Sequence, residues 1–502
     1  MKKFLIFCAA VLAACAVCMP AFAEIPLGSV SFSESDTEKT RGIKKDYNKA
    51  YLTYFSVIAS SAAYAPKGEG AAYLKNYGWD ISVQQASRDK WDVHFIQAKN
   101  HMSDGTNLYL LSFRGSVNKK DWTADLTAGQ VIYGGKTLEE SEKIAKGKAE
   151  RTEDMDAAVL KKAAKKQNKS PEKEVDENAE NKNLPKVHKG FNVYADAVLH
   201  HLLDDGKSEF LKQFRADRNA RLLLTGHSLG GAVATLVGQR LIDYGFDPQR
   251  LQVITFGAPA VANKPFKQKY GNRMNLIRVT NTADPIPLTL QALLRTYKQF
   301  GEEVRFRIPG TTSNMTHIMN LYLDAGLRNY YQALDKGVKQ GALQDWPDLL
   351  LSESGKPLVL ICVKEGKEDK KKKTEPMAML QRFMLNEYKA LFPNYSVYYT
   401  DDPWKEMEAR QADYLLVLEF DANPSREDRS WFLTLSQTLS DKDGVIAAGS
   451  VARRTSPEAG NIRAAMKAVR LQREELLKQT DWLRPGSVQV PGKFTEAEAA
   501  NR

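Results

Sequence analysis

The chain has 502 residues, of which 43% are hydrophobic, and it carries a formal net charge of +11. A chain of this length is too long to fold around a single hydrophobic core, so we expect about two or three domains. The apolar share excludes a chain that is disordered over most of its length. The positive charge suits anionic surfaces such as lipid headgroups or cell-wall polymers. No nucleic-acid partner is expected, because the sequence contains no nucleic-acid-binding motif.

The first 23 residues have the pattern of a secretory signal peptide. Met1-Lys2-Lys3 supplies positive charge, an apolar stretch runs from Phe4 to Met19, and Ala21-Phe22-Ala23 forms a small-residue cleavage site. The apolar stretch is shorter than the roughly 18 to 20 residues that span a bilayer, so we expect cleavage rather than a membrane-spanning anchor. The chain would then be an exported bacterial protein, either periplasmic or secreted.

A second processing site lies inside this leader. Leu12-Ala13-Ala14-Cys15 resembles the lipobox of bacterial lipoproteins, which would leave Cys15 as a lipidated first residue. Cleavage after Ala23 would instead remove all three cysteines of the leader, so the remaining Cys362 could form no intramolecular disulfide. Cys362 lies in the apolar run Pro357–Val363, which favours a buried position.

Buried strands alternate with helical segments along the middle of the chain. Tyr47–Tyr64 has apolar residues at helical spacing and predicts a packed helix. This alternation indicates a mainly parallel sheet with helices on both faces, which is an α/β fold. The expected strands are Asn107–Phe113, Arg221–Thr225, Gln252–Phe256 and Asn275–Val279, and the expected helices between them are Tyr194–Phe214 and Gly231–Tyr244.

Two regions depart from this pattern. Residues 134–186 are rich in Lys, Glu, Ala and Asp and are interpreted as a charged insertion, helical in part and mobile in part. A second α/β pattern begins near Gly355, so we predict a main domain over 24–350, a small α/β domain over 355–481 and a loose tail over 482–502. In the small domain we expect a strand through Cys362, a helix over 376–392, strands near Ser396, Leu416, Leu433 and Val445, a hairpin turn at Asp443-Gly444, and a closing helix over 457–479.

A candidate nucleophile lies where a strand meets a helix. Gly226-His227-Ser228-Leu229-Gly230 follows the strand segment Leu222–Thr225 and precedes a helix that begins with small residues. Small residues at these places permit the sharp turn that exposes a serine hydroxyl in a nucleophile elbow. The motif alone occurs often by chance, so the strand and helix around it carry the assignment of Ser228.

A serine hydroxyl needs a base, and the base needs an acid to orient it, in the chain order serine, acid, histidine. His317 is the only histidine after Ser228 and is therefore the candidate base. Asp284 comes just beyond the predicted strand Asn275–Val279, at the edge where open α/β sheets place functional groups, and it is the preferred acid. The other acidic residues in this interval are Asp243, Asp247, Glu302 and Glu303.

These residues lie in blocks that resemble the class 3 lipases, the fungal-type lipases of the α/β-hydrolase superfamily. The resemblance runs from about Tyr47 to Tyr330. It implies an α/β-hydrolase fold, a triad of Ser228, Asp284 and His317, and no metal or organic cofactor. The blocks are Phe113-Arg114-Gly115-Ser116, Asp121-Trp122 with Ala124-Asp125-Leu126, Val187–Phe191, Thr255–Pro259, Asp284–Pro287, and His317 with Tyr322.

The resemblance also implies roles around the triad. Ser116, by its backbone N–H and hydroxyl, and the backbone N–H of Leu229 would stabilise the oxyanion of the tetrahedral intermediate. A lid that carries Trp122 would cover the groove. The charged insertion after Leu126 and the second domain depart from the family pattern. Because these segments lie where the family forms the groove that binds the acyl chain, the sequence does not identify the substrate.

The insertion contains a short amphipathic pattern. Met155, Val159 and Ala163 lie on one helical stripe that is flanked by lysines. Such a stripe settles at an anionic membrane surface and would connect lipid binding to lid opening. A solvated charged spacer without a function is the alternative.

Three functions are compatible with the sequence. The first is hydrolysis of a carboxylic ester in a lipid, either a glyceride or a phospholipid. The second keeps the triad but acts on a soluble or polysaccharide-linked acyl ester. The third is a non-catalytic envelope binding or assembly protein that retains the hydrolase domain as a scaffold. The lipid, the acyl chain, the role of the second domain and the oligomeric state are left open by the sequence.

Overall fold

The computed structural model of the protein describes residues 32–76, 79–88, 91–101, 106–117, 129–146, 183–203, 208–306, 316–343, 358–365, 388, 395–398, 402–424, 431–454 and 461–480. Both processing sites of the leader lie outside these residues. Within them, no helix combines the length and the hydrophobicity that crossing a membrane requires.

The larger sheet of the described chain has seven strands in the order β1-β2-β3-β6-β7-β8-β9. Strands β3, β6, β7, β8 and β9 run parallel, and β1 and β2 continue the sheet antiparallel at one edge. The mainly parallel α/β fold is thus confirmed, and the antiparallel edge was not predicted. The strands are β1 (Asp80–Arg88), β2 (Trp91–His101), β3 (Asn107–Phe113), β6 (Arg221–His227), β7 (Leu251–Phe256), β8 (Asn275–Asn281) and β9 (Glu302–Phe306).

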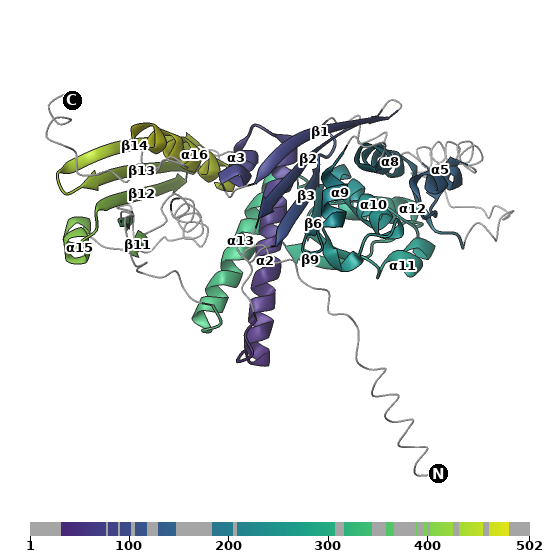
Figure 1. The fold of residues 1–502 in the computed structure, drawn as a ribbon, viewed down its shortest axis with the longest axis horizontal. Helices are drawn as coiled ribbons and strands as arrows, with labels where there is room; N and C mark the ends of the chain where they lie inside the picture. The colour runs from purple at the N-terminus through teal and green to yellow at the C-terminus, as the bar shows by residue number, and fades with distance from the viewer. Residues whose placement is uncertain are drawn as a thin grey trace, which may run out of the picture.

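Helices cover both faces of this sheet (Figure 1). Leu110 and Leu223 belong to the apolar cluster of α2 and α13, whereas their neighbours Leu111 and Leu224 belong to the cluster of α8 and α10. Successive strand residues point to opposite faces, so continuous apolar runs bury the sheet on both sides. The helices are α2 (Glu38–Tyr64), α3 (Glu69–Asn76) and α13 (Met319–Lys339) on one side, and α8 (Lys189–Leu203), α9 (Phe210–Ala216), α10 (Leu229–Asp243), α11 (Lys264–Tyr270) and α12 (Ile286–Leu294) on the other.

Two predicted helices have other bounds in the structure. Helix α2 begins at Glu38 instead of Tyr47, because the Thr37 side chain caps it by accepting a hydrogen bond from the N–H of Thr40. The predicted helix Tyr194–Phe214 is wrong as a single element, since α8 ends at Leu203 and α9 begins at Phe210. The sequence between them contains Gly206, a poor residue for a helix interior.

The ends of the predicted insertion belong to the packed domain. Strands β4 (Gln130–Ile132) and β5 (Lys186–His188) pair antiparallel, and α5 (Leu138–Lys146) follows β4. Glu142 of α5 forms ion pairs with Arg88 and His200. Burial raises the pKa of Glu142, but hydrogen bonds from these two partners outweigh it and lower the pKa to about 2. The stripe at Met155 and the rest of residues 147–182 lie outside the described chain.

A second sheet of five strands has the order β11-β10-β12-β13-β14. Cys362 of β10 is fully buried, and the predicted hairpin turn at Asp443-Gly444 joins β13 to β14. Helix α15 was not predicted, and the predicted helix over 376–392 lies outside the described residues except for Tyr388. The elements are β10 (Val359–Glu365), β11 (Tyr395–Tyr398), α15 (Pro403–Arg410), β12 (Tyr414–Pro424), β13 (Trp431–Asp441), β14 (Gly444–Arg454) and α16 (Asn461–Gln479).

The two sheets are joined through helices. Helix α16 covers β13 and β14 and also contacts α3 and α13 of the larger unit (Figure 1). Apolar side chains of both units form one cluster at this contact. The domain bounds that we expect, 24–350 and 355–481, stay predictions.

A buried charge lies beneath α5, between α8 and α10. Arg240 is 1% exposed, its guanidinium lies 3.8 Å from the Tyr133 ring centroid, and its Nη1 donates to the carbonyl of Gly134 at 2.6 Å. Asp196 is 8% exposed and accepts a hydrogen bond from Asn192 Nδ2 at 2.7 Å. Burial raises the pKa of Asp196 to about 6, although the charge of Arg240 opposes this shift.

Replacing Asp196→Asn should therefore change stability in a pH-dependent way. The folded-state pKa of Asp196 lies above the ordinary value of 3.8. The contribution of this carboxyl to the free energy of unfolding is therefore complete below pH 4 and is lost as the pH rises through about 6. Relative to the wild type, we expect the variant to gain about 3 kcal/mol in free energy of unfolding between pH 4 and pH 8. Urea denaturation at both pH values measures this difference.

The matched control is Asp247→Asn, because Asp247 is exposed. That substitution changes the same chemical group at an exposed position. A constant difference from wild type for Asp196→Asn would show that this carboxyl does not resist ionisation in the folded protein.

Candidate active site

The turn between β6 and α10 has the geometry of a nucleophile elbow. Ser228 has φ 58° and ψ −127°, a conformation that costs a non-glycine residue about 1 to 3 kcal/mol. A Cβ atom at Gly226 would lie 2.4 Å from the carbonyl group of Gly230, and one at Gly230 would lie 2.1 Å from the carbonyl oxygen of Phe113. The Ser228 N–H donates to the carbonyl of Phe256 at 2.9 Å. The glycines of the motif are therefore required by close backbone contacts.

Asp284 and His317 meet in the structure as predicted for an acid and a base. His317 Nδ1 lies 2.6 Å from Asp284 Oδ2. The side chain of Asp284 has no exposed surface, whereas that of His317 is 19% exposed. This hydrogen bond orients the imidazole and selects the tautomer in which Nε2 is the proton acceptor.

The Asp284 carboxylate has two further hydrogen-bond donors. Tyr322 Oη donates to Oδ2 at 2.5 Å, and the N–H of Ile286 donates to Oδ1 at 2.9 Å. Burial raises the pKa of Tyr322 well above its ordinary value, so its hydroxyl keeps the proton that it donates. Three donors compensate the buried negative charge, which would otherwise be costly to keep ionised.

The other acidic residues of the interval have different partners. Asp243 accepts from Tyr133 Oη at 2.7 Å and pairs with Arg273. Asp247 caps a short 3-10 helix. Glu302 pairs with Lys49, and Glu303 pairs with Arg305. Of these acids, the structure therefore brings Asp284 to the histidine.

The loop after β3 packs against the elbow. A Cβ atom at Gly115 would lie 2.6 Å from the carbonyl oxygen of His227, so the residue next to Ser116 contacts the residue next to Ser228. Leu229 is buried at the start of α10, and Ser116 is half-buried. Both predicted oxyanion residues thus lie at the same edge of the sheet as Ser228. Trp122 lies outside the described residues.

A tyrosine from α2 links this loop to the elbow. Tyr64 Oη accepts a hydrogen bond from the backbone N–H of Gly115 and lies 3.0 Å from His227 Nδ1. The His227 ring centroid is 4.6 Å from that of His317. Burial, and then the nearby His317, lower the pKa of His227 well below its ordinary value, so His227 stays neutral beside His317.

Several of these supporting residues carry no signal in the sequence. Tyr64 precedes the elbow by more than 160 positions, and it was predicted only as part of a packed helix. Asn281 Nδ2 donates to the carbonyl of Thr316 at 3.3 Å, and Thr316 Oγ1 donates to that of Ala283 at 2.7 Å. These two bonds join the loops of Asp284 and His317. In the described part of the chain, no group of three His, Cys, Asp or Glu side chains forms a metal site.

Comparison with known proteins finds similarity over the part of the chain that holds most of this site. Residues 110–293 match the lipase (class 3) family, a segment that contains Ser228 and Asp284. This part of the chain is a class 3 lipase domain. His317 lies beyond the matched residues, on the continuation of the same domain into α13.

Two related proteins are similar to this chain over only part of their own length. The Saccharomyces cerevisiae protein LIH1 is 28% identical over 168 residues, which are 33% of this chain and 39% of the relative. Phospholipase A(1) DAD1 of Arabidopsis thaliana is 33% identical over 107 residues, 20% of this chain and 24% of the relative. The triacylglyceride lipase of Rhizomucor miehei has 20% identity and a TM-score of 0.35, and the match covers 54% of this chain and 81% of that one.

Substitution Tyr64→Phe tests the link between the oxyanion loop and the elbow. It removes the acceptor of the Gly115 N–H and the hydrogen bond to His227 while keeping the ring. We expect kcat on a soluble ester to fall about tenfold, with little change in KM, because about 1 to 1.5 kcal/mol of positioning is lost. Steady-state kinetics together with circular dichroism measure the effect.

Tyr51→Phe is the control, since Tyr51 lies on the same helix but packs in an aromatic cluster with Phe55 and Tyr330. Its kcat should match that of the wild type. An unchanged kcat in Tyr64→Phe would contradict a positioning role for the hydroxyl.

Proposed function

We propose that this protein is a serine hydrolase that cleaves carboxylic esters of lipids. The observation that supports this most is the Asp284–His317 hydrogen bond beside the strained Ser228 elbow, within a class 3 lipase domain. Strain at a polar, reactive residue is typical of functional sites, where surrounding packing holds an unfavourable conformation in place.

The residues suggest an acyl-transfer mechanism. Ser228 Oγ attacks the ester carbonyl while His317 Nε2 accepts its proton, and the carbonyl oxygen becomes an oxyanion. The backbone N–H groups of Ser116 and Leu229 stabilise this charge. His317 then returns the proton to the leaving alcohol as the C–O bond breaks. Water, activated by the same histidine, releases the fatty acid and restores Ser228.

The identity of the lipid is the finer part of the proposal. The relative from Arabidopsis thaliana is named a phospholipase A(1), and the net charge of +11 favours an anionic interface. Both features favour a phospholipid over a neutral glyceride. The alternative substrate, a soluble or polysaccharide-linked acyl ester, predicts a preference for short acyl chains in a chain-length series.

If the protein has a non-catalytic envelope role, this geometry is retained without a catalytic function. That role predicts no covalent reaction of Ser228 with a fluorophosphonate, whereas the hydrolase predicts rapid reaction. Export is also part of the proposal. The mass of the mature protein distinguishes cleavage after Ala23 from a lipidated form that begins at Cys15.

Replacement of the three residues should abolish activity with a graded pattern. Ser228→Ala should eliminate fluorophosphonate labelling and reduce turnover by a factor on the order of 10⁶, and His317→Ala should be similarly severe. Asp284→Asn should reduce kcat by about 10⁴, because the wrong tautomer of His317 would be favoured. Turnover of a short-chain ester and covalent labelling measure these effects.

Asp247→Asn provides a matched carboxylate control and should retain wild-type turnover. Activity above about a tenth of the wild-type value in Ser228→Ala, in protein that remains folded, would show that another residue is the nucleophile.

A further inference from the structure

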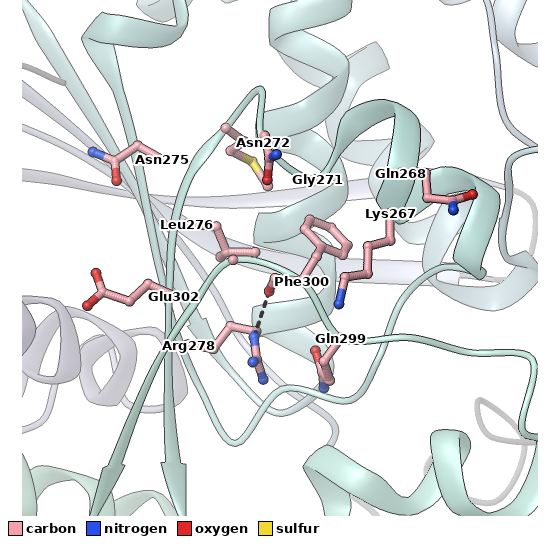
Figure 2. A pocket seen from close by; sticks show the side chains of 12 residues that line it. Lys267, Gln268, Gly271, Asn272, Asn275, Leu276, Arg278, Gln299, Phe300 and Glu302 are labelled. Carbon is pink, nitrogen blue, oxygen red and sulfur yellow. Dashed lines mark hydrogen bonds between the residues drawn. The ribbon is translucent and has the colours of Figure 1, made fainter. Parts of the chain in front are cut away.

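A cavity of about 640 Å³ opens beside α11, at the start of β8 and β9. Its walls come from the second half of α11 and from the segments that enter the two strands, and Leu276 and Phe300 supply apolar surface (Figure 2). Small-molecule sites have about this size, and most of the side chains that line this cavity are polar. This cavity has no part in the mechanism above.

The cavity does not include the residues of the proposed triad. Leu276 is the second residue of β8, whereas Asp284 follows the end of that strand at Asn281. Along this strand, Leu276 lies about 17 Å and Arg278 about 10 Å from Asn281, at roughly 3.3 Å per residue. None of Ser228, Asp284 and His317 lines the cavity. A ligand in this cavity would therefore not occupy the place of the reacting ester.

The chain around the cavity is strongly basic. Residues 248–283 contain no Asp or Glu, and they include Arg250, Lys264, Lys267, Lys269, Arg273 and Arg278. Of these, Lys267 and Arg278 line the cavity. Charges of one sign around a concave surface attract a ligand of the opposite sign.

Arg278 is a desolvated cation that is only partly neutralised. Its side chain is 12% exposed, and burial lowers its pKa. Its Nε donates to the carbonyl of Phe300 at 2.7 Å, and its Nη1 lies 3.6 Å from Glu303. The Glu303 carboxylate also binds Arg305 at 2.8 Å, so two guanidinium groups share one negative charge.

The acidic residue that lines the cavity does not cancel this charge. Glu302 forms an ion pair with Lys49. Figure 2 shows its carboxylate pointing away from Lys267 and Arg278, whose ends lie on the same side of the Phe300 ring as the amide of Gln299. Gln299 is held in place, because its Nε2 donates to the carbonyls of Ala258 and Pro287.

We propose that this cavity binds a small anion that carries a phosphate group, with Lys267 and Arg278 as its cationic partners. Two cations from different elements suit a doubly charged group, and the apolar surface beside them accommodates a short organic part such as glycerol. A guanidinium held by its Nε keeps the planar fork that pairs with phosphate oxygens. The same chemistry occurs in a free phosphate ester and in an anionic lipid headgroup.

The test uses the full chain and three probes: inorganic phosphate, glycerol 1-phosphate, and vesicles of phosphatidylcholine with or without phosphatidylglycerol. Thermal shift and calorimetry are carried out at constant ionic strength, adjusted with chloride. We expect saturable binding of phosphate or glycerol 1-phosphate by the wild type, and at least a tenfold higher Kd in Lys267→Ala.

Lys269→Ala is the matched control, because Lys269 lies exposed on the same helix but does not line the cavity. It should bind as the wild type does. Vesicle binding that depends on phosphatidylglycerol and is lost in Lys267→Ala assigns the site to a headgroup, whereas binding of the soluble probes alone assigns it to a free phosphate ester. A response that does not saturate, or an equal loss in both lysine variants, overturns the proposal. The activity on a soluble ester does not enter this test, so it stands apart from the proposed function.

Discussion

The candidate active site depends on one close backbone contact, between the end of β3 and the start of α10. Gly230 approaches the carbonyl of Phe113 so closely that no side chain fits, and Gly226 is confined by Gly230 in the same way. This contact brings the strand that precedes the Ser116 loop against the helix that follows Ser228. A larger residue at either glycine would separate the two, because backbone atoms cannot yield as a flexible side chain can. Ser228, the loop of Ser116 and Asp284 can then lie at one edge of the parallel sheet.

Burial of Asp284 sets the second constraint. A carboxylate without exposed surface is stable as an anion only when hydrogen-bond donors replace water. Ile286, Tyr322 and His317 supply those donors from three different parts of the chain. A network that is satisfied in this way also fixes the direction of the histidine ring. The same hydrogen bonds therefore stabilise the buried charge of Asp284 and orient the ring of His317.

The sequence predicted those parts of the molecule whose physical causes are local. Strands such as Asn107–Phe113 are buried on both faces and appear as continuous apolar runs, and the elbow needs small residues at fixed spacing. Strand β1 was missed because it is half exposed and rich in polar residues, so it has no such run. Tyr64 was missed as a site residue because its role arises from the packing of α2 on the sheet. The pattern of residues around Tyr64 does not indicate a contact with His227, because His227 is distant in the sequence.

Helices α2 and α13 connect the site to the rest of the protein. They run antiparallel, since Asp46 pairs with Lys336 at one end, and Gly326 packs on Val57 towards the other. Tyr64 ends α2, and His317 lies just before α13, so both helices present a group to the active site at the same end. Helix α13 also contacts α16 of the second unit. The second unit is thus packed directly on the helix that follows His317, and removal of that unit would expose apolar surface of α13. An effect of the second unit on hydrolysis would then arise through the position of α13, even though the unit contributes no residue to the proposed triad.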